Sequence, residues 1–168
     1  MSSEMLKDTE VGVTTVIGFP LGANTIETKV FETTDAIKNG ATEVDMVINI
    51  GKLKEKDSDY LKEEISRIKE ACEDKVLKVI IETALLDEEE KILISSICIE
   101  CDVDYVKTST GFNGGGATVE DVKLIKSIVK DKYKIKASGG IRDREFMEKL
   151  IDAGADRIGA SAGVKLIK

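Results

Sequence analysis

The sequence of 168 residues contains no histidine and no tryptophan, one proline and only three cysteines. Without histidine, the commonest metal ligand and general base are both missing, so acid–base chemistry must come from Lys, Asp, Glu, Tyr or Cys. Three cysteines are too few for the disulfide framework of a small secreted domain. No apolar run approaches the ~20 residues of a membrane span, and Met1–Glu10 lacks the apolar segment of a signal peptide, so no membrane partner is expected.

The chain is instead rich in charged residues (34%) and apolar residues (42%). This apolar share is too high for an intrinsically disordered chain. The 25 Lys and Arg against 32 Asp and Glu give a net charge of −7, which argues against a nucleic-acid partner. A chain of this size buries roughly two-thirds of its unfolded surface. No linker or low-complexity tract divides the sequence, so we expect residues 1–168 to form a single domain.

Apolar segments of β-strand character recur at regular intervals. They are Val13–Ile17, Val44–Ile48, Leu77–Ile81, Val103–Val106, Ile135–Ala137 and Arg157–Gly159. The segments between them have helical periodicity, and several begin at residues suited to a helix N-terminus. These expected first residues are Asn24, Asp87, Thr118 and Asp143. Six strands that alternate with helices predict an α/β fold with a parallel sheet.

Charged residues interrupt three of the predicted strands: Asp45, Lys107 and Lys136. In a parallel sheet covered on both faces, such interruptions are costly unless they line a site. Active sites of parallel-sheet enzymes form at the carboxyl ends of the strands, and we expect the three residues late in theirs. A barrel would bring all three around one pocket. A complete barrel needs eight βα units and at least ~200 residues, so this chain is about two units short.

The two lysines suggest covalent chemistry. A lysine is a nucleophile only when neutral, and desolvation or a second nearby cation favours the neutral form. Lys136 is the candidate for a second cation beside Lys107. The alternative is that both lysines are solvated at strand ends, and the residues alone do not decide between the two. Asp45 likewise fits either a proton shuttle or a buried counter-ion.

Two glycine-bearing turns are suited to anions: Ser138–Gly140 and Gly159–Gly163. Glycine lets a phosphate approach backbone N–H groups, although each segment alone is equally consistent with a plain tight turn. The glycines of Gly111–Gly116 are more typical of a mobile loop. Cys98 and Cys101 lie on the apolar stripe of a predicted helix, so we expect them to pack in the core.

Four motifs, in this order along the chain, carry a resemblance to a known family. They are Val16-Ile17-Gly18-Phe19-Pro20-Leu21-Gly22, Glu43-Val44-Asp45-Met46-Val47-Ile48-Asn49, Val106-Lys107-Thr108-Ser109-Thr110-Gly111 and Lys136-Ala137-Ser138-Gly139-Gly140-Ile141-Arg142. Together they closely resemble deoxyribose-phosphate aldolase, from about Val13 to the C-terminus. The resemblance implies a TIM (β/α)8-barrel fold, here an incomplete barrel with about six βα units, and a class I aldolase that uses no metal or other cofactor.

The resemblance also implies the reaction: reversible cleavage of 2-deoxyribose 5-phosphate to acetaldehyde and glyceraldehyde 3-phosphate, in deoxyribonucleotide catabolism. By motif match, Lys107 is the Schiff-base lysine, while Asp45 and Lys136 form the proton relay. Five residues match the family's phosphate-binding positions: Gly111, Gly139, Gly140, Gly159 and Ser161. Ala162 stands where many members have a second serine. A cytoplasmic location and a homo-oligomer of two or four chains are further implications.

The sequence departs from the family at its N-terminus, because nothing matches the two βα units with which other members begin. The first strand corresponds to the third strand of the barrel. We therefore expect two open sheet edges, and a chain that is unstable, oligomeric or weakly active by itself. Two other functions remain open: a different phosphate-sugar barrel enzyme without lysine chemistry, and a non-catalytic copy that binds phosphate.

Overall fold

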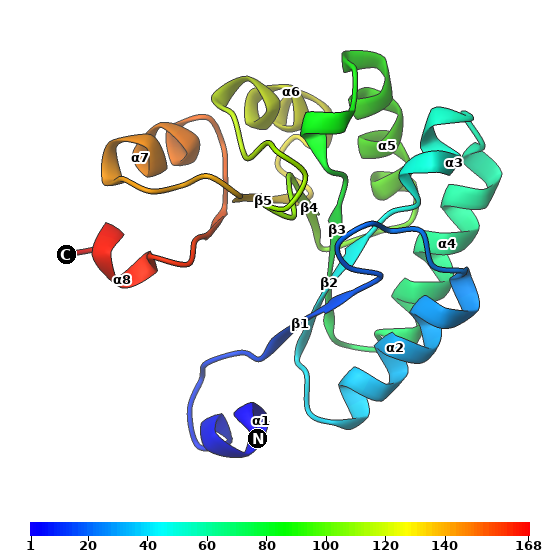
Figure 1. Ribbon diagram of the computed structural model, residues 1–168, viewed down its shortest axis with the longest axis horizontal. Coiled ribbons are helices and arrows are strands. Elements are labelled where there is room, and N and C mark those ends of the chain that lie inside the picture. Colours follow the sequence, from blue (N-terminus) through cyan, green and yellow to red (C-terminus); the bar gives the residue numbers. More distant parts are fainter.

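A computed structural model describes all residues from Met1 to Lys168 and contains one six-stranded sheet in the order β1-β2-β3-β4-β5-β6 (Figure 1). Every neighbouring pair of strands is parallel. The strands are β1 (Thr14–Ile17), β2 (Glu43–Val47), β3 (Val76–Ile80), β4 (Tyr105–Lys107), β5 (Lys134–Ser138) and β6 (Arg157–Gly159). The α-helices are α1 (Ser2–Leu6), α2 (Ile26–Lys38), α3 (Ile50–Lys54), α4 (Ser58–Ala71), α5 (Glu88–Glu100), α6 (Val119–Val129), α7 (Arg144–Asp152) and α8 (Gly163–Leu166).

The sheet curls into part of a barrel, with helices α2 to α7 along its outer, convex side (Figure 1). Each connection between successive strands passes through at least one helix, as parallel strands require. The two end strands, β1 and β6, each pair with only one neighbour. The predicted incomplete barrel of six βα units is confirmed. None of the helices is long and apolar enough to cross a membrane.

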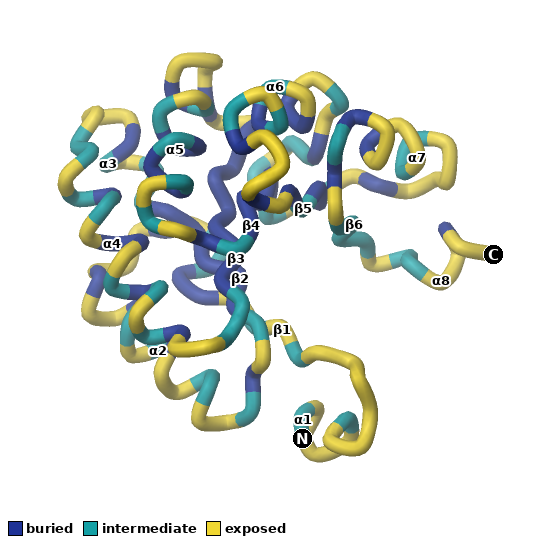
Figure 2. The backbone as a smooth tube through the Cα atoms, turned by 180° about the vertical axis from the view of Figure 1, so that it is seen from behind, coloured by how far each residue is buried: buried dark blue, intermediate teal, exposed yellow.

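The hydrophobic core lies between the convex side of the sheet and the helices. Strand residues such as Val44, Met46 and Val79 are completely buried there. They belong to a cluster of 30 buried residues, which includes three residues of α4 and the residue that follows it: Leu61, Ile65, Ile68 and Cys72. Figure 2 shows buried residues along the strands and on the helix faces turned toward them. The core is therefore covered even though the barrel is open.

The concave face of the sheet has the opposite character. In the parallel ladder, Asp45 pairs with Lys78 on β3, and Lys107 pairs with Lys136 on β5. Paired residues of neighbouring strands point to the same face, so the charged residues share the concave side. Val16, which pairs with Asp45 from the edge strand β1, is 44% exposed. Water thus reaches a face on which charged groups predominate.

Three of the four expected helix starts are confirmed. The side chains of Asp87, Thr118 and Asp143 accept hydrogen bonds from the backbone three residues later, and Asp87 forms a full capping box with Glu90. The prediction for Asn24 was wrong: Thr25 is the cap of α2, because its hydroxyl accepts from the N–H of Thr28. Other differences from the predicted pattern include the additional short helix α3 and the start of β4, which is Tyr105 instead of Val103.

Candidate active site

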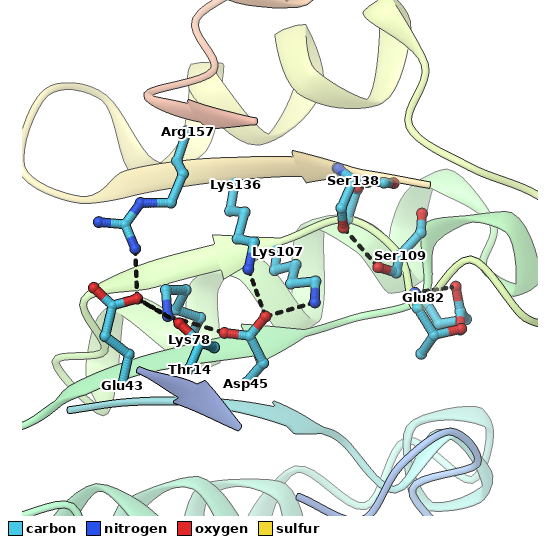
Figure 3. Close-up of polar contacts among 12 residues, drawn as sticks. Thr14, Glu43, Asp45, Lys78, Glu82, Lys107, Ser109, Lys136, Ser138 and Arg157 are labelled. Atoms are coloured by element: carbon cyan, nitrogen blue, oxygen red, sulfur yellow. Dashed lines mark hydrogen bonds and ion pairs between the residues drawn. The ribbon is translucent and has the colours of Figure 1, made fainter. Parts of the chain in front are cut away.

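Three lysines converge on one buried carboxylate at the centre of the concave face (Figure 3). Lys107 Nζ and Lys136 Nζ each lie 2.6 Å from Asp45 Oδ2, and Lys78 Nζ lies 2.9 Å from Asp45 Oδ1. Asp45 is only 2% exposed, so these contacts form with little water around them. The structure thus brings together the three residues that the sequence singled out, although 91 residues separate Asp45 from Lys136.

The position of these residues along their strands is only partly as expected. Lys107 is the last residue of β4, but Asp45 and Lys136 lie in the middle of β2 and β5. The prediction that all three come late in their strands was therefore wrong for two of them. They still meet because the ladder places Lys107 beside Lys136, while Asp45 reaches both from across the curved sheet.

Sequence reasoning missed a second carboxylate below this centre. Glu43 Oε2 lies 2.6 Å from both Lys78 Nζ and an Arg157 guanidinium nitrogen, and it accepts from Thr14 Oγ1 at 2.9 Å. The fully buried Lys78 therefore bridges Glu43 and Asp45. A signal was present: Lys78 interrupts an apolar strand in the same way as Asp45 does. The contact between Glu43 and Arg157 spans 114 residues and has no local signal.

The electrostatics of the centre depend on the balance between burial and charge. Burial opposes ionisation of Asp45, but the positive charges of Lys107 and Lys136 outweigh it and hold the Asp45 pKa at about 2. For Lys136, burial lowers the pKa more than the Asp45 carboxylate raises it. Asp45 is thus ionised at neutral pH, and Lys136 releases its proton more readily than a lysine in water.

The low pKa of Asp45 predicts a loss of stability in acid. A carboxyl whose pKa falls from 3.8 to about 2 on folding stabilises the folded state above pH 3.8 and loses that contribution as the pH drops to about 2. The contribution amounts to about 2 kcal/mol. In urea unfolding between pH 5 and pH 2, the Asp45→Asn variant should show a weaker pH dependence than the wild type. Equal pH dependence of the two proteins would contradict this prediction.

A cavity of about 410 Å³ adjoins two of the three lysines. Lys107 and Lys136 line it, together with all five residues that the resemblance assigns to phosphate: Gly111, Gly139, Gly140, Gly159 and Ser161. The N–H groups of Gly111, Gly139, Gly140 and Ser161 donate no backbone hydrogen bond. Arg142, which sequence reasoning had not assigned to the site, adds a positive charge to the same cavity. The cavity therefore combines free N–H donors with cations, as an anion requires.

Two of these glycines are required by space or by backbone conformation. A Cβ at Gly159 would lie 2.8 Å from Ser138 Cβ and 3.2 Å from Lys136 Cε, so a larger residue would displace the lysine. Gly139 has a φ of +85°, which side chains rarely allow, and a Cβ there would lie 3.0 Å from Gly116 Cα. The glycine-rich segment Gly111–Gly116 therefore packs against the turn after β5.

Comparison with known proteins places the chain among aldolases. Residues 4–167 match the model of the DeoC/LacD family aldolases. The chain is 57% identical to the deoxyribose-phosphate aldolase of Caldanaerobacter subterraneus, covering 100% of this chain and 74% of that protein. It is 58% identical to the enzyme of the same name from Staphylococcus carnosus, covering 99% of this chain and 76% of that protein.

Solved structures of aldolases have the same fold as this chain. The fold superposes on an aldolase named QR15 with a TM-score of 0.92 and 47% identity, covering 97% of this chain and 73% of that one. It superposes on the tetrameric deoxyribose phosphate aldolase of Aeropyrum pernix with a TM-score of 0.90 and 33% identity, covering 98% and 70%. Because the family model matches nearly the whole chain and the curated relatives are 57% and 58% identical to it, the chain belongs to the DeoC/LacD family of aldolases.

Proposed function

We propose that the chain catalyses the reversible cleavage of 2-deoxyribose 5-phosphate to acetaldehyde and glyceraldehyde 3-phosphate, with Lys107 as the Schiff-base lysine. One observation carries the proposal: Lys107 and Lys136 both contact the same oxygen of buried Asp45 and line a cavity with free N–H groups. In such a centre a carboxylate and a second lysine can exchange protons with the lysine that forms the imine. A phosphate-sugar enzyme without imine chemistry is the alternative, and trapping of an imine at Lys107 separates the two.

The first half of the reaction forms the imine. Neutral Lys107 Nζ attacks the C1 carbonyl carbon of the open-chain sugar, and loss of water yields an iminium that can accept an electron pair. Asp45 receives the proton that the amine gives up, and Lys136 protonates the departing hydroxyl. The distance of 2.6 Å from Asp45 Oδ2 to each lysine is suited to these transfers.

The second half breaks the carbon–carbon bond. A base removes the proton from the C3 hydroxyl, the C2–C3 bond breaks, and its electron pair passes to the iminium to give an enamine. Glyceraldehyde 3-phosphate leaves. Protonation of the enamine at C2 and hydrolysis of the resulting iminium release acetaldehyde and restore Lys107. Asp45 and Lys136 carry these protons, directly or through one water.

The glycine-lined wall orients the substrate. Gly111, Gly139, Gly140 and Ser161 bind the phosphate through N–H groups, Ser161 through its hydroxyl as well, and Gly159 lines the wall beside them. Fixing the phosphate end places C1 of the sugar against Lys107, which contributes to catalysis by orientation. Residues 1–168 act as one barrel-derived domain in the cytoplasm, and copies of the chain associate as a homodimer or homotetramer.

The proposal predicts a covalent adduct at a single lysine. Acetaldehyde followed by borohydride should add an ethyl group to Lys107, because the reductant traps the imine as a stable secondary amine. Peptide mass spectrometry locates the label, and the Lys107→Leu variant should not be labelled. Lys54→Leu, which changes a lysine outside the cavity, serves as the control. Labelling of another lysine would overturn the assignment, and a labelled chain without turnover would favour the non-catalytic alternative.

A further inference from the structure

Glu82 is a buried glutamate next to the candidate active site, and the mechanism above does not use it. It lies two residues after the end of β3 and is completely buried, yet it forms no ion pair. Its backbone is left-handed, with φ 57° and ψ 62°, a conformation that residues other than glycine rarely adopt. Such backbone outliers gather at functional sites, where the surrounding structure imposes them.

The left-handed backbone marks a break in the sheet register. The N–H of Ile81 donates to the carbonyl of Lys107 at 3.0 Å, but the N–H of Thr83 donates to the carbonyl of Thr108, also at 3.0 Å. In an unbroken parallel ladder, Thr83 would instead reach Ser109. The β3 side thus contains one extra residue, Glu82, as in a β-bulge. Bulges beside active sites redirect a side chain.

The redirected carboxylate holds the turn that follows the Lys107 strand. One of its oxygens accepts from the N–H of Thr110 at 3.1 Å, and the other accepts from the Thr110 hydroxyl and from Asn113 Nδ2, the latter at 2.8 Å. The neighbouring hydroxyls of Thr83 and Ser109 are buried without any partner. All side-chain hydrogen bonds between the two turns therefore come from Glu82.

We propose that Glu82 is a positioning residue that fixes the Thr110–Asn113 turn so that the N–H of Gly111 faces the phosphate cavity. Gly111 directly follows the clamped Thr110, has a φ of +85°, and lines the cavity. Lys107 does not depend on the clamp, because the ladder between β4 and its neighbours holds it. The inference rests on the phosphate-binding part of the proposed function. It assigns Glu82 to phosphate affinity and not to imine formation.

The Glu82→Gln variant tests this separation of roles. Glutamine keeps the size of the side chain, but its NH₂ group cannot accept a hydrogen bond from Thr110 or Asn113. Calorimetric titration with inorganic phosphate should show about tenfold weaker binding, the equivalent of one lost hydrogen bond to a charged group. The rate of Lys107 labelling by acetaldehyde and borohydride should stay at the wild-type value. Glu88→Gln, an exposed glutamate on α5, is the matched control.

Unchanged phosphate affinity would overturn the inference. So would a parallel fall in phosphate affinity, labelling rate and melting temperature, because that pattern indicates a general structural role. If Glu82→Gln does not fold, Thr110→Val removes the hydroxyl from the other side of the clamp and is judged by the same results. A wild-type chain that binds phosphate but is not labelled at Lys107 would refute the lysine chemistry alone. A wild-type chain that binds no phosphate would refute the phosphate-binding part of the proposed function and, with it, this inference.

Discussion

Replacing Asp45 with asparagine should lower the rate of sugar-phosphate cleavage by about 10²- to 10⁴-fold, the usual contribution of one acid–base group. Asparagine has nearly the same shape as aspartate but cannot take a proton from Lys107 or pass one to Lys136, and both lysines contact its Oδ2. Substrate binding should change much less, because the cavity wall does not include Asp45. Steady-state kinetics would show this as a loss in kcat with a smaller change in KM.

Imine formation in the same variant distinguishes a proton shuttle from a mere counter-ion. The Asp45 charge raises the pKa of Lys136, so its removal lowers that pKa further and keeps the cluster capable of imine chemistry. Borohydride trapping of acetaldehyde at Lys107 should therefore persist at a reduced rate, with water as the proton acceptor in place of Asp45, while turnover falls much further. Asp59→Asn, an exposed position on α4, controls for the substitution itself. Wild-type turnover of Asp45→Asn would show that Asp45 only balances charge.

The largest stability effect is expected at the buried ion pair between α2 and α4. Lys29 Nζ lies 2.6 Å from Glu64 Oε1 and donates to the carbonyl of Val47 at 2.7 Å, while Glu64 Oε2 accepts from the N–H of Asn49 at 2.9 Å. Both side chains are completely buried. Burial lowers the pKa of Lys29 and raises that of Glu64, so each group depends on the other to remain charged.

Lys29→Met should lower the free energy of unfolding by about 3–5 kcal/mol, because it leaves the Glu64 carboxylate buried without a cation. Urea denaturation at pH 7 measures the loss. The double variant Lys29→Met/Glu64→Leu should recover part of it by removing the stranded charge. Recovery should be incomplete, since Val47 and Asn49 still lack their partners. A loss below about 1 kcal/mol in the single variant, typical of an exposed pair, would contradict this prediction.

Sequence patterns were informative wherever the governing interaction is local or periodic. Asp45, Lys107 and Lys136 stand out because a charge in an apolar strand has few explanations. The caps Asp87, Thr118 and Asp143 are equally local, since each bonds a backbone N–H three residues later. The error at Asn24 arose because two adjacent polar residues both suit a cap, and only the backbone conformation selects Thr25.

The missed features depend on distance or on backbone conformation. Lys78 belongs to a segment that was treated as a continuous apolar strand. Its role as a bridge is evident only in the structure, where it forms ion pairs with Glu43 and Asp45. Arg157 finds its partner from a strand that is not a neighbour in the sheet. The sequence around Glu82 does not indicate a left-handed backbone or a shifted hydrogen-bond register between the segments after β3 and β4. These features depend on how the strands are arranged in the folded sheet.

The apolar and charged faces of the sheet differ in which amino-acid substitutions they can tolerate. On β2, Val44 and Met46 face the dry core, whereas Glu43 and Asp45 face the open concave side with their lysine and arginine partners. A substitution at a core position disturbs folding alone, whereas a substitution on the concave face disturbs the charged centre and its chemistry as well as its contribution to stability. Residues that are neighbours in the sequence are thus constrained differently, one by packing in the core and the next by the charged centre. New substrate preferences can arise from substitutions on the concave face, provided that a charged residue and its ion-pair partner are replaced together. The core that maintains the fold then stays unaltered.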